Sequence, residues 1–384
     1  MISRFEKTKA CCDSFLEMGV PGFDLAVYKD GECVLRHMGG FSHRENKVPV
    51  KGTELYYLYS CSKPITCTAA LQLWERGLFS LEDRLSDYMP EFEQMNVRTE
   101  QGVKKSEKPI LIRHLFEMTA GFSYELDSPQ LRLAKAETGG RCPTRETMKY
   151  LAKEPLLFEP GDRWEYSLCH DVLAALVEVI SGQSFDAYVK ENIFKPLGMK
   201  SASYDIGCAE RQQLACLYQR DVDSGLIYDC GKNNRYILGT EYASGGAGCV
   251  ATVEDCMKFA EELRCGSTIL KRSTVELMRA SRLSVSQERS YWKNIYYGYG
   301  LGVRCPKADG LFTDFGWGGA AGAYLAVDIE NGVSLYLSQH TLSSPNQGIR
   351  DRVYLHVMAE LMGREDFAAL AADNSFSGDY RYTF

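Results

Sequence analysis

Short runs of apolar and β-branched residues begin close to the N-terminus. Residues 23–28 and 33–37 form two such runs, and Asp30-Gly31 lies between them. Asp-Gly favours the type I′ turn of a β-hairpin, because both central residues of that turn take positive φ. Before the hairpin, residues 3–18 carry apolar side chains at helical spacing, which predicts an amphipathic helix.

The same pattern returns in the last third of the chain. Four runs predict successive strands, over residues 299–304, 310–315, 323–329 and 333–338. Asn331-Gly332 supplies a tight turn between the last two runs, and residues 349–362 predict a closing helix. The segment from Arg364 onward has weak periodicity, so no element is predicted there.

The middle of the chain is mostly helical segments and polar loops, with few strand-like runs. Strands at both ends of the chain thus bracket a helical middle. The simplest arrangement is one antiparallel sheet built from both ends and flanked by the terminal helices. We therefore predict an α+β fold in which residues 1–79 and 240–384 form a sheet domain. Residues 80–239 form an inserted, mostly helical domain, with an active site in the cleft between the two.

A candidate nucleophile precedes a segment that is apolar or small on nearly every face. Ser60 and Lys63 lie just before residues 67–74, which predict a buried helix with Pro64 in its first turn and Gly77 as its stop. Residues three apart share a helix face, so the Lys63 amine can reach the Ser60 hydroxyl. Burial and the positive helix end both disfavour the ammonium, which would make Lys63 a base for Ser60.

The S-x-x-K spacing is weak evidence when it stands alone, and Ser290 and Lys293 repeat it. That second match precedes a strand rich in tyrosine and glycine instead of opening a buried helix, so we attribute it to chance. Without further evidence, Ser60 could also be an ordinary helix N-cap followed by a surface lysine.

Two further segments contain groups suited to acyl-transfer chemistry. Tyr166 lies at the entry to a predicted helix that continues to residue 180, and a nearby ammonium would shift its phenol towards phenolate. Residues 315–322 contain four glycines, which allow close backbone approach and an N–H directed at an oxyanion beside that of Ser60. The alternatives are a core tyrosine and an ordinary glycine-rich turn.

Composition narrows the function classes. The net charge of −7 and the pI near 5.6 argue against a nucleic-acid-binding protein. No apolar run has the length of a signal or a membrane span, so we expect a cytoplasmic protein without membrane partners. The 14 cysteines include no C-x-x-C pair, which favours buried free thiols and gives no indication of a metal site or cofactor.

Taken in order, these segments resemble the serine β-lactamase and penicillin-binding-protein superfamily. The chain is most similar to its class C-like branch and, within that, to the family VIII carboxylesterases. The segments that carry the resemblance are Tyr57–Pro64, Ile112–Leu115, Thr119–Gly121, Phe158–Tyr166, Pro196–Met199, Gly245–Gly248 and Tyr299–Val303. The resemblance implies a β-lactamase/transpeptidase-like fold, with Ser60 acylated and Lys63 and Tyr166 sharing base and acid duty. It also implies an oxyanion hole formed by the N–H groups of Ser60 and Ala320.

The chain departs from the β-lactamase pattern at two places. Leu168 stands where Tyr-x-Asn has an amide, and Trp317-Gly318-Gly319 stands where β-lactamases and peptidases have Lys-Thr-Gly. The site thereby loses amide recognition and a cation for a substrate carboxylate, and gains an aromatic wall. With Leu168, Trp317, Gly318 and Gly319 as substrate-binding residues, we expect a carboxylesterase acting on small uncharged esters.

Other functions remain open at this point. A β-lactamase or D-amino peptidase, an acyltransferase and a non-catalytic penicillin-binding-type domain all fit the same scaffold. A Ser-His-Asp hydrolase has less support, because the chain contains no G-x-S-x-G elbow. His114 and His170 lie near the functional segments, and we expect both to be structural. The sequence gives no indication of the oligomeric state.

Overall fold

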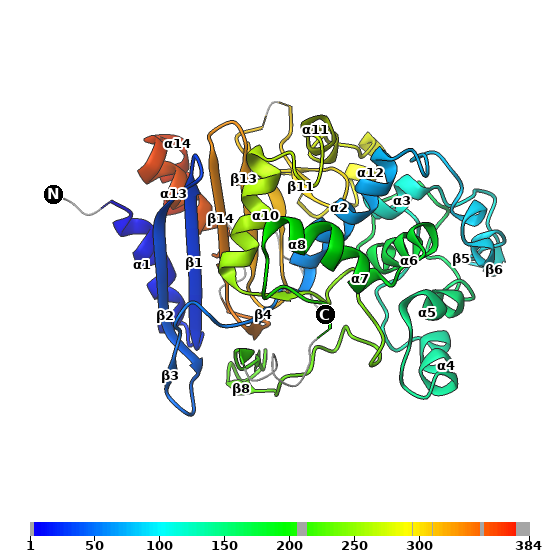
Figure 1. Ribbon diagram of the computed structural model, residues 1–384, viewed down its shortest axis with the longest axis horizontal. Coiled ribbons are helices and arrows are strands. Elements are labelled where there is room, and N and C mark those ends of the chain that lie inside the picture. The colour runs from blue at the N-terminus through cyan, green and yellow to red at the C-terminus, as the bar shows by residue number, and fades with distance from the viewer. Residues whose placement is uncertain (1–3, 206–212, 294, 309, 346–348, 374–384) are drawn as a thin grey trace.

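The chain forms a sheet with helices on both faces, and a mostly helical region lies beside one face (Figure 1). The computed structural model describes residues 4–205, 213–293, 295–308, 310–345 and 349–373. Within these residues the central sheet has eight strands. Their spatial order is β10 (Gly298–Tyr299), β11 (Arg304–Cys305), β12 (Phe315–Gly318), β13 (Tyr324–Asp328), β14 (Val333–Ser338), β1 (Gly22–Lys29), β2 (Glu32–His43) and β3 (Val48–Pro49).

All neighbouring strands of this sheet are antiparallel, and its centre joins the two ends of the chain. Strand β1 lies between β2 and β14, with Asp24 opposite Ser338. In the β1–β2 turn Asp30 and Gly31 both have positive φ, at 52° and 89°, as the predicted type I′ turn requires. The predicted α+β class, with one antiparallel sheet from both termini, is confirmed.

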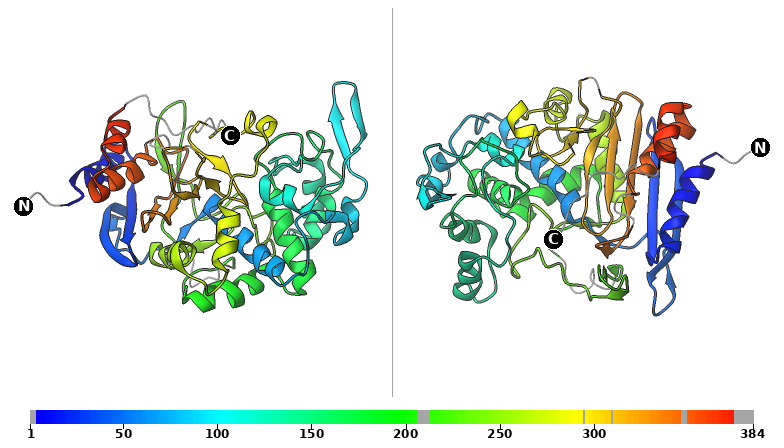
Figure 2. Two further views of the ribbon diagram at one scale, coloured as in Figure 1. Left: turned by 90° about the horizontal axis from the view of Figure 1, so that it is seen from above. Right: turned by 180° about the vertical axis from the view of Figure 1, so that it is seen from behind.

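Side chains alternate between the two faces of the sheet, as the period of a strand dictates. Phe23, Leu25 and Val27 of β1 join the core beneath the terminal helices, whereas Ala26 joins the larger core on the opposite face. Helices α1 (Glu6–Glu17), α13 (Arg352–Met362) and α14 (Glu365–Ala372) cover the first face, and α10 (Val253–Cys265) covers the second (Figure 2). The sheet is therefore buried on both sides.

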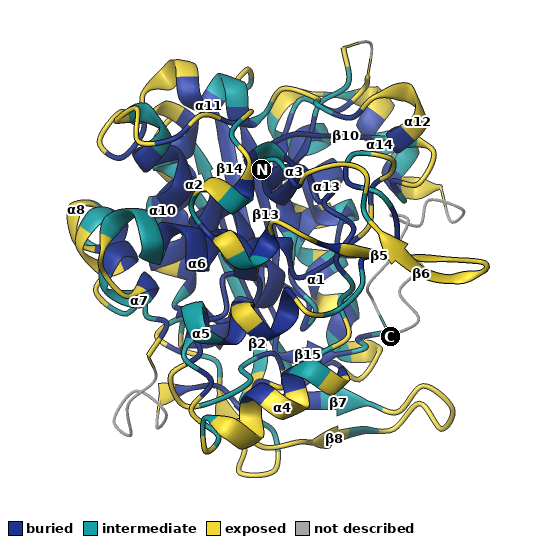
Figure 3. Ribbon diagram, turned by 90° about the vertical axis from the view of Figure 1, so that its right-hand side faces the viewer, coloured by how far each residue is buried: buried dark blue, intermediate teal, exposed yellow. Residues whose placement is uncertain are grey.

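Helix α2 (Ser62–Glu75) runs through the larger core and packs on α6 (Cys169–Ser181). Residues 62–73 are all buried, in agreement with the predicted buried helix, and Gly77 follows its end with positive φ. Figure 3 shows α2 and α6 in the mostly buried interior and, by contrast, an exposed hairpin of β5 (Asn96–Thr99) and β6 (Gly102–Lys105). The other helices are α3 (Ile112–Glu117), α4 (Pro129–Glu137), α5 (Thr144–Leu151), α7 (Phe185–Val189), α8 (Lys195–Leu197), α11 (Arg272–Met278) and α12 (Val285–Glu288).

Three small sheets lie outside the central one. They pair β4 (Tyr56–Tyr57) with β9 (Val250–Ala251), β5 (Asn96–Thr99) with β6 (Gly102–Lys105), and β7 (Tyr218–Arg220) with both β15 (Thr341–Leu342) and β8 (Ile227–Asp229). Short irregular turns complete the elements: η1 (Tyr59–Cys61), η2 (Leu85–Asp87), η3 (Pro90–Phe92) and the π-helical η4 (Lys190–Phe194). The domain boundaries predicted at residues 79 and 240 stay a prediction.

Several predicted elements differ from the structure. The strand predicted over 299–304 is two short strands, because Gly300 N–H donates to the Val303 carbonyl and turns the chain. The strand predicted over 310–315 begins only at Phe315 and continues to Gly318, where β13 provides its partner. Beyond Arg364, α14 forms because Phe367 packs on Phe312 and Tyr354.

No single helix among the described residues is long and apolar enough to cross a membrane, although α6 and the segment Phe185–Leu197 reach that length together across a 79° bend. All thirteen described cysteines are free, and nine of them are buried. The predicted pattern of mostly buried thiols is confirmed for these residues.

Candidate active site

Ser60 lies in the 3-10 turn η1, directly before α2. The preceding Tyr59 has φ of +48°, a left-handed conformation that costs free energy for a residue with a Cβ. Its side chain is fully buried against Tyr57 and Tyr236, and this packing holds the strained backbone in place. Tertiary contacts therefore fix the direction in which the Ser60 hydroxyl points.

The structure brings the three predicted catalytic side chains together. The Ser60 hydroxyl is hydrogen-bonded to the Tyr166 hydroxyl, and Lys63 Nζ donates to Ser60 Oγ across 3.2 Å. Lys63 is completely buried and also donates to the Gly246 carbonyl oxygen at 2.7 Å. The arrangement places a hydroxyl between an amine and a phenol, with 8% of Ser60 exposed.

Burial changes the protonation of Lys63. It lowers the pKa of the amine from 10.5 to about 7, while the nearby negative charge of Asp171 acts in the opposite direction. A substantial share of the protein therefore carries a neutral amine beside Ser60 at neutral pH. A neutral amine can accept the Ser60 proton, whereas an ammonium cannot.

The pKa of Tyr166 shifts in the direction opposite to the one expected from the sequence. Its full burial raises the pKa of the phenol above the usual value of 10, although hydrogen bonds from Ser60 and the Trp317 side chain act in the opposite direction. Lys63 Nζ lies 4.6 Å from the centre of the Tyr166 ring, so it stands over the ring face. Tyr166 is thus a neutral phenol, which can donate a proton but is not a resting base.

Aromatic rings surround Tyr166 on several sides. Trp317 lies parallel to it, with ring centres 6.2 Å apart and an interplanar angle of 5°. Trp292 and Tyr124 approach to 5.1 and 5.0 Å. The sequence analysis missed Trp292 and Tyr124, although Trp292 lies inside the second S-x-x-K match, because loops distant in sequence bring them to the site.

Asp171 is a third residue near the site that the sequence analysis missed. It lies in the first turns of α6 and is fully buried, and Tyr242 and Ser244 both donate to its Oδ1. Burial raises the pKa of this carboxyl, and the hydrogen bond from Ser244 and the charge of Lys63 lower it. A Cβ at Gly246 would lie 2.7 Å from Asp171 Oδ2 and 3.4 Å from Lys63 Nζ, so the carboxylate and the amine flank the same glycine.

The predicted oxyanion-hole segment lies against the turn that carries Ser60. A Cβ at Gly319 would come within 2.4 Å of the Leu58 carbonyl oxygen, so only glycine allows this approach. The Cys61 thiol contacts the Trp317 carbonyl, and the buried Arg350 donates to the Gly319 carbonyl at 2.7 Å. Ala320 follows directly and is partly exposed. The pairing of its N–H with that of Ser60 stays a prediction.

The remaining candidates occupy different environments. Leu168 is only 2% exposed and belongs to the larger core, whereas Gly318 is partly exposed at the end of β12. His114 Nδ1 accepts from Leu111 N–H at the start of α3, and burial lowers the pKa of its imidazole to about 3. Burial also lowers the pKa of His170 well below its usual value. Both imidazoles are therefore neutral and buried.

Several proteins of known activity or structure are similar to this chain. The sequence profile of the family described as Beta-lactamase matches residues 8–359. Esterase EstB of Burkholderia gladioli is 29% identical over 372 residues, which cover 88% of this chain and 92% of that protein. Acyltransferase calJ of Penicillium decumbens is 27% identical over 307 residues, covering 71% and 72%.

A solved structure shares the architecture. EstCE1, a hydrolase with promiscuous acyltransferase activity, superposes with a TM-score of 0.74 over 91% of this chain and 98% of its own, at 24% identity. The predicted β-lactamase/transpeptidase-like fold is confirmed by this likeness.

Proposed function

The chain belongs to the Beta-lactamase family, whose members are serine hydrolases or acyltransferases, and we propose that it is a carboxylesterase that acts through an acyl-enzyme on Ser60. One observation carries the proposal: the Ser60 hydroxyl is hydrogen-bonded to both the Tyr166 phenol and the Lys63 amine in a buried site. The similarity to esterase EstB supports the same activity.

In the acylation step, neutral Lys63 accepts the proton of the Ser60 hydroxyl as Oγ attacks the ester carbonyl carbon. The N–H groups of Ser60 and Ala320 stabilise the resulting oxyanion. When the tetrahedral intermediate collapses, the carbon–oxygen bond to the leaving alcohol breaks and Tyr166 donates a proton to the alkoxide. The Lys63 ammonium returns its proton to Tyr166, which leaves an acyl-serine and a free alcohol.

Deacylation runs through the same groups in reverse. A water molecule takes the place of the alcohol, and neutral Lys63, acting through Tyr166, accepts a proton as the water oxygen attacks the acyl carbon. Collapse of the second tetrahedral intermediate breaks the bond to Ser60 Oγ, which regains its proton. The products are a carboxylic acid and the original site.

The substrate class follows from the groups beside Ser60. Trp317 stands in place of the cationic residue that would attract a substrate carboxylate, and its buried ring lies beside that of Trp292, with ring centres 6.2 Å apart. Leu168 replaces the amide that would recognise a substrate amide carbonyl. We therefore propose small, uncharged, apolar esters in preference to β-lactams and peptides.

The test combines covalent labelling with a substrate panel. Intact-protein mass spectrometry after fluorophosphonate treatment, followed by peptide mapping, is expected to locate one adduct on Ser60. In parallel, p-nitrophenyl acetate and butyrate should be hydrolysed, and a chromogenic cephalosporin at least about 100-fold less efficiently in kcat/KM. Comparable cephalosporin turnover would contradict the esterase assignment, and a failure to label Ser60 would contradict the nucleophile.

Transfer of the acyl group to an alcohol is a second candidate, favoured by the similarity to acyltransferase calJ. It needs the same acyl-enzyme and differs only in the acceptor that reaches it. Product analysis of p-nitrophenyl butyrate turnover with increasing concentrations of a primary alcohol separates the two. A new ester that forms at the expense of butyrate supports transfer, and butyrate alone supports hydrolysis.

A further inference from the structure

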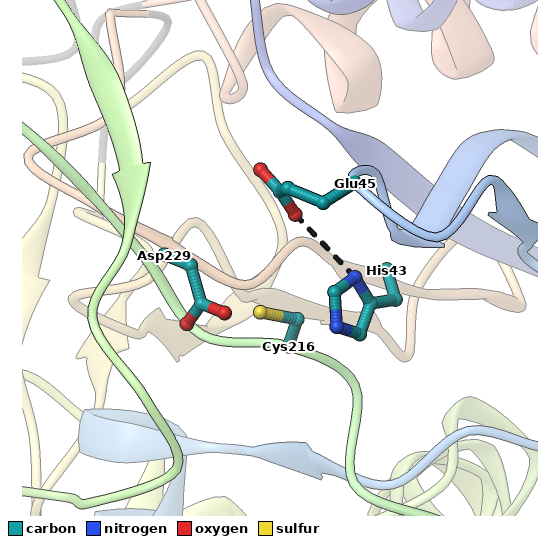
Figure 4. Close-up of side chains that lie close together, drawn as sticks. All are labelled: His43, Glu45, Cys216 and Asp229. Atoms are coloured by element: carbon teal, nitrogen blue, oxygen red, sulfur yellow. Dashed lines mark ion pairs between the residues drawn. The ribbon is translucent and has the colours of Figure 1, made fainter.

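A cluster of four metal-binding side chains lies where two β-hairpins meet, away from the site described above. His43 ends β2, Glu45 lies in the β2–β3 turn, Cys216 precedes β7 and Asp229 ends β8. In Figure 4 their side chains converge on one space, and we name them the His43 cluster. Because they come from three separated segments, no spacing in the sequence indicated them.

The donor atoms of the His43 cluster suit one particular ion. They are an imidazole nitrogen, a thiol sulfur and two carboxylate oxygens, and all lie within 4.8 Å of one another. Zn²⁺ takes this mixture of ligands in tetrahedral sites, where neighbouring ligand atoms are about 3.3 to 3.8 Å apart. Small side-chain movements can bring the ligand atoms to these separations, since His43 is partly exposed and Glu45 is exposed. Nδ1 of His43 already lies 3.4 Å from a carboxylate oxygen of Glu45.

Hydrogen bonds outside the four side chains help to fix the backbone around the His43 cluster. Cys216 N–H donates to the Ser42 carbonyl at 2.8 Å, and Arg44 N–H donates to the Tyr218 hydroxyl at 2.7 Å. The Arg44 guanidinium also donates to the Ile227 carbonyl at 2.7 Å. Cys216 itself is only 5% exposed, with its thiol directed into the cluster (Figure 4). The ligands are thus held close to position before any ion arrives.

We propose that His43, Glu45, Cys216 and Asp229 bind one Zn²⁺ as a structural site. On binding, the Cys216 thiol gives its proton to the solvent and forms a sulfur–zinc bond, while a neutral ring nitrogen of His43 and one oxygen from each carboxylate complete the coordination. Three anionic ligands and one Zn²⁺ leave a net charge of −1, which faces the Arg44 guanidinium 3.1 Å from Glu45. Four protein ligands leave no position for substrate, which is typical of a structural site.

The zinc site would stabilise a segment that borders the nucleophile. Leu55 pairs with the chain next to Cys216, donating to the Gln213 carbonyl and accepting from Ala215 N–H. His340 joins the Ala215 carbonyl to Tyr57 N–H through its two ring nitrogens, at 3.0 and 3.1 Å. Zinc would therefore tie the β7–β8 hairpin to the β2–β3 hairpin, next to the strand that leads into η1. Its effect should appear in stability before it appears in turnover.

The test uses the full chain, treated with EDTA and then titrated with Zn²⁺ or Co²⁺. Calorimetry should find about one Zn²⁺ per chain, and Co²⁺ should give the thiolate charge-transfer band and the visible bands of tetrahedral cobalt. Zn²⁺ should raise the Tm, because it binds only the folded state. Ester turnover at 25 °C should change less than about twofold, since the cluster touches no catalytic group.

Variants identify the ligands. Cys216→Ser should abolish the charge-transfer band and weaken Zn²⁺ binding by about 100-fold or more, whereas Cys230→Ser, a nearby exposed thiol, should retain both. If Cys216→Ser fails to fold, Asp229→Asn and Glu45→Gln change exposed side chains and should each weaken binding by about tenfold or more. Stoichiometric binding that none of these variants weakens, or no binding by the native chain, would overturn the proposal.

Discussion

Two segments of this protein share the S-x-x-K spacing, and their serines lie in different environments although both lysines are buried. Ser60 and Lys63 open α2, which is buried on all sides. Ser290 and Lys293 follow the short helix α12, and Ser290 is exposed. The same three-residue spacing therefore occurs in different structures, and the surrounding residues determine whether the serine is hydrogen-bonded to the lysine.

The partners of each pair explain the difference. Ser60 is hydrogen-bonded to Lys63 and Tyr166, both of them titratable. The Ser290 hydroxyl instead accepts from Trp164 N–H at 2.9 Å and donates to the Gln287 carbonyl, and Lys293 lies 3.6 Å from Asp351. A serine becomes a nucleophile only where its neighbours can accept a proton, which a carbonyl oxygen and an amide N–H cannot do.

The sharpest test of this comparison replaces each serine. Ser60→Ala should lower kcat/KM for p-nitrophenyl butyrate by about 10³-fold or more, because the nucleophile is lost. Ser290→Ala should stay within about threefold of the native protein, since its hydroxyl serves only backbone groups. Steady-state kinetics on both variants check this. Similar losses of kcat/KM in the two variants would contradict the assignment of Ser60 alone as the nucleophile.

The second test asks whether the phenol acts chemically or only packs. Tyr166→Phe should lower kcat by about 10² to 10⁴-fold, because the proton donor to the leaving group is removed. Tyr299→Phe is the matched control, since its buried hydroxyl has no hydrogen-bond partner among the described residues. Rates on esters with progressively better leaving groups provide the readout, because a good leaving group needs less protonation. A loss in Tyr166→Phe that does not depend on the leaving group would argue for packing.

Lys63 should make the stability of the protein depend on pH. Lys63 has a pKa of about 7 when folded and 10.5 when unfolded, so between these values only the unfolded state holds the proton. Raising the pH from 7 to 9 therefore favours folding through this group. Lys63→Met should remove that contribution. Urea unfolding at several pH values measures it as the slope of the free energy of unfolding against pH.

Lys293→Met retains Lys63 and serves as the matched control. It should lower the free energy of unfolding by about 1 to 3 kcal/mol, because Asp351 loses one of its cationic partners. Equal slopes in the two lysine variants would show that Lys63 carries no special proton equilibrium.

The smallest effect concerns Asp171, the buried carboxyl group near Lys63. The charge of Asp171 opposes the fall in the pKa of Lys63, so Asp171→Asn should lower that pKa further. Because neutral Lys63 is the proposed base, the acidic limb of the kcat/KM profile should move to lower pH. A kcat/KM profile measured from pH 5 to 9 tests this. An acidic limb that does not shift would show that Asp171 has no effect on the pKa of the catalytic base.

Local signals in the sequence account for much of this fold and site. The turn at Asp30-Gly31 and the apolar runs beside it fixed the central hairpin, and the uniform burial of α2 followed from its composition. Ser60, Lys63 and Tyr166 were recognisable because each stands at the start of a helix in an ordered set of segments.

What the sequence left out depends on contacts between distant segments. Strand β12 contains Gly316 and Gly318, which have little strand propensity, so its position follows from pairing with β13. Asp171 and Trp292 look like ordinary helix and loop residues until folding places them beside Lys63 and Tyr166. The direction of the Tyr166 pKa was also misjudged, because burial outweighs its polar neighbours and burial is a property of the folded chain.

The pairing of β1 with β14 also governs how the protein can be made. During synthesis, the partner of residues 22–29 at 333–338 appears only after the intervening residues 30–332 have been made. The long edge of β1 must wait unpaired in the meantime, which favours slow folding and exposes a strand to wrong partners. Nascent chains of this protein should therefore depend on chaperones, and catalytic competence should appear only after β14 has joined the sheet.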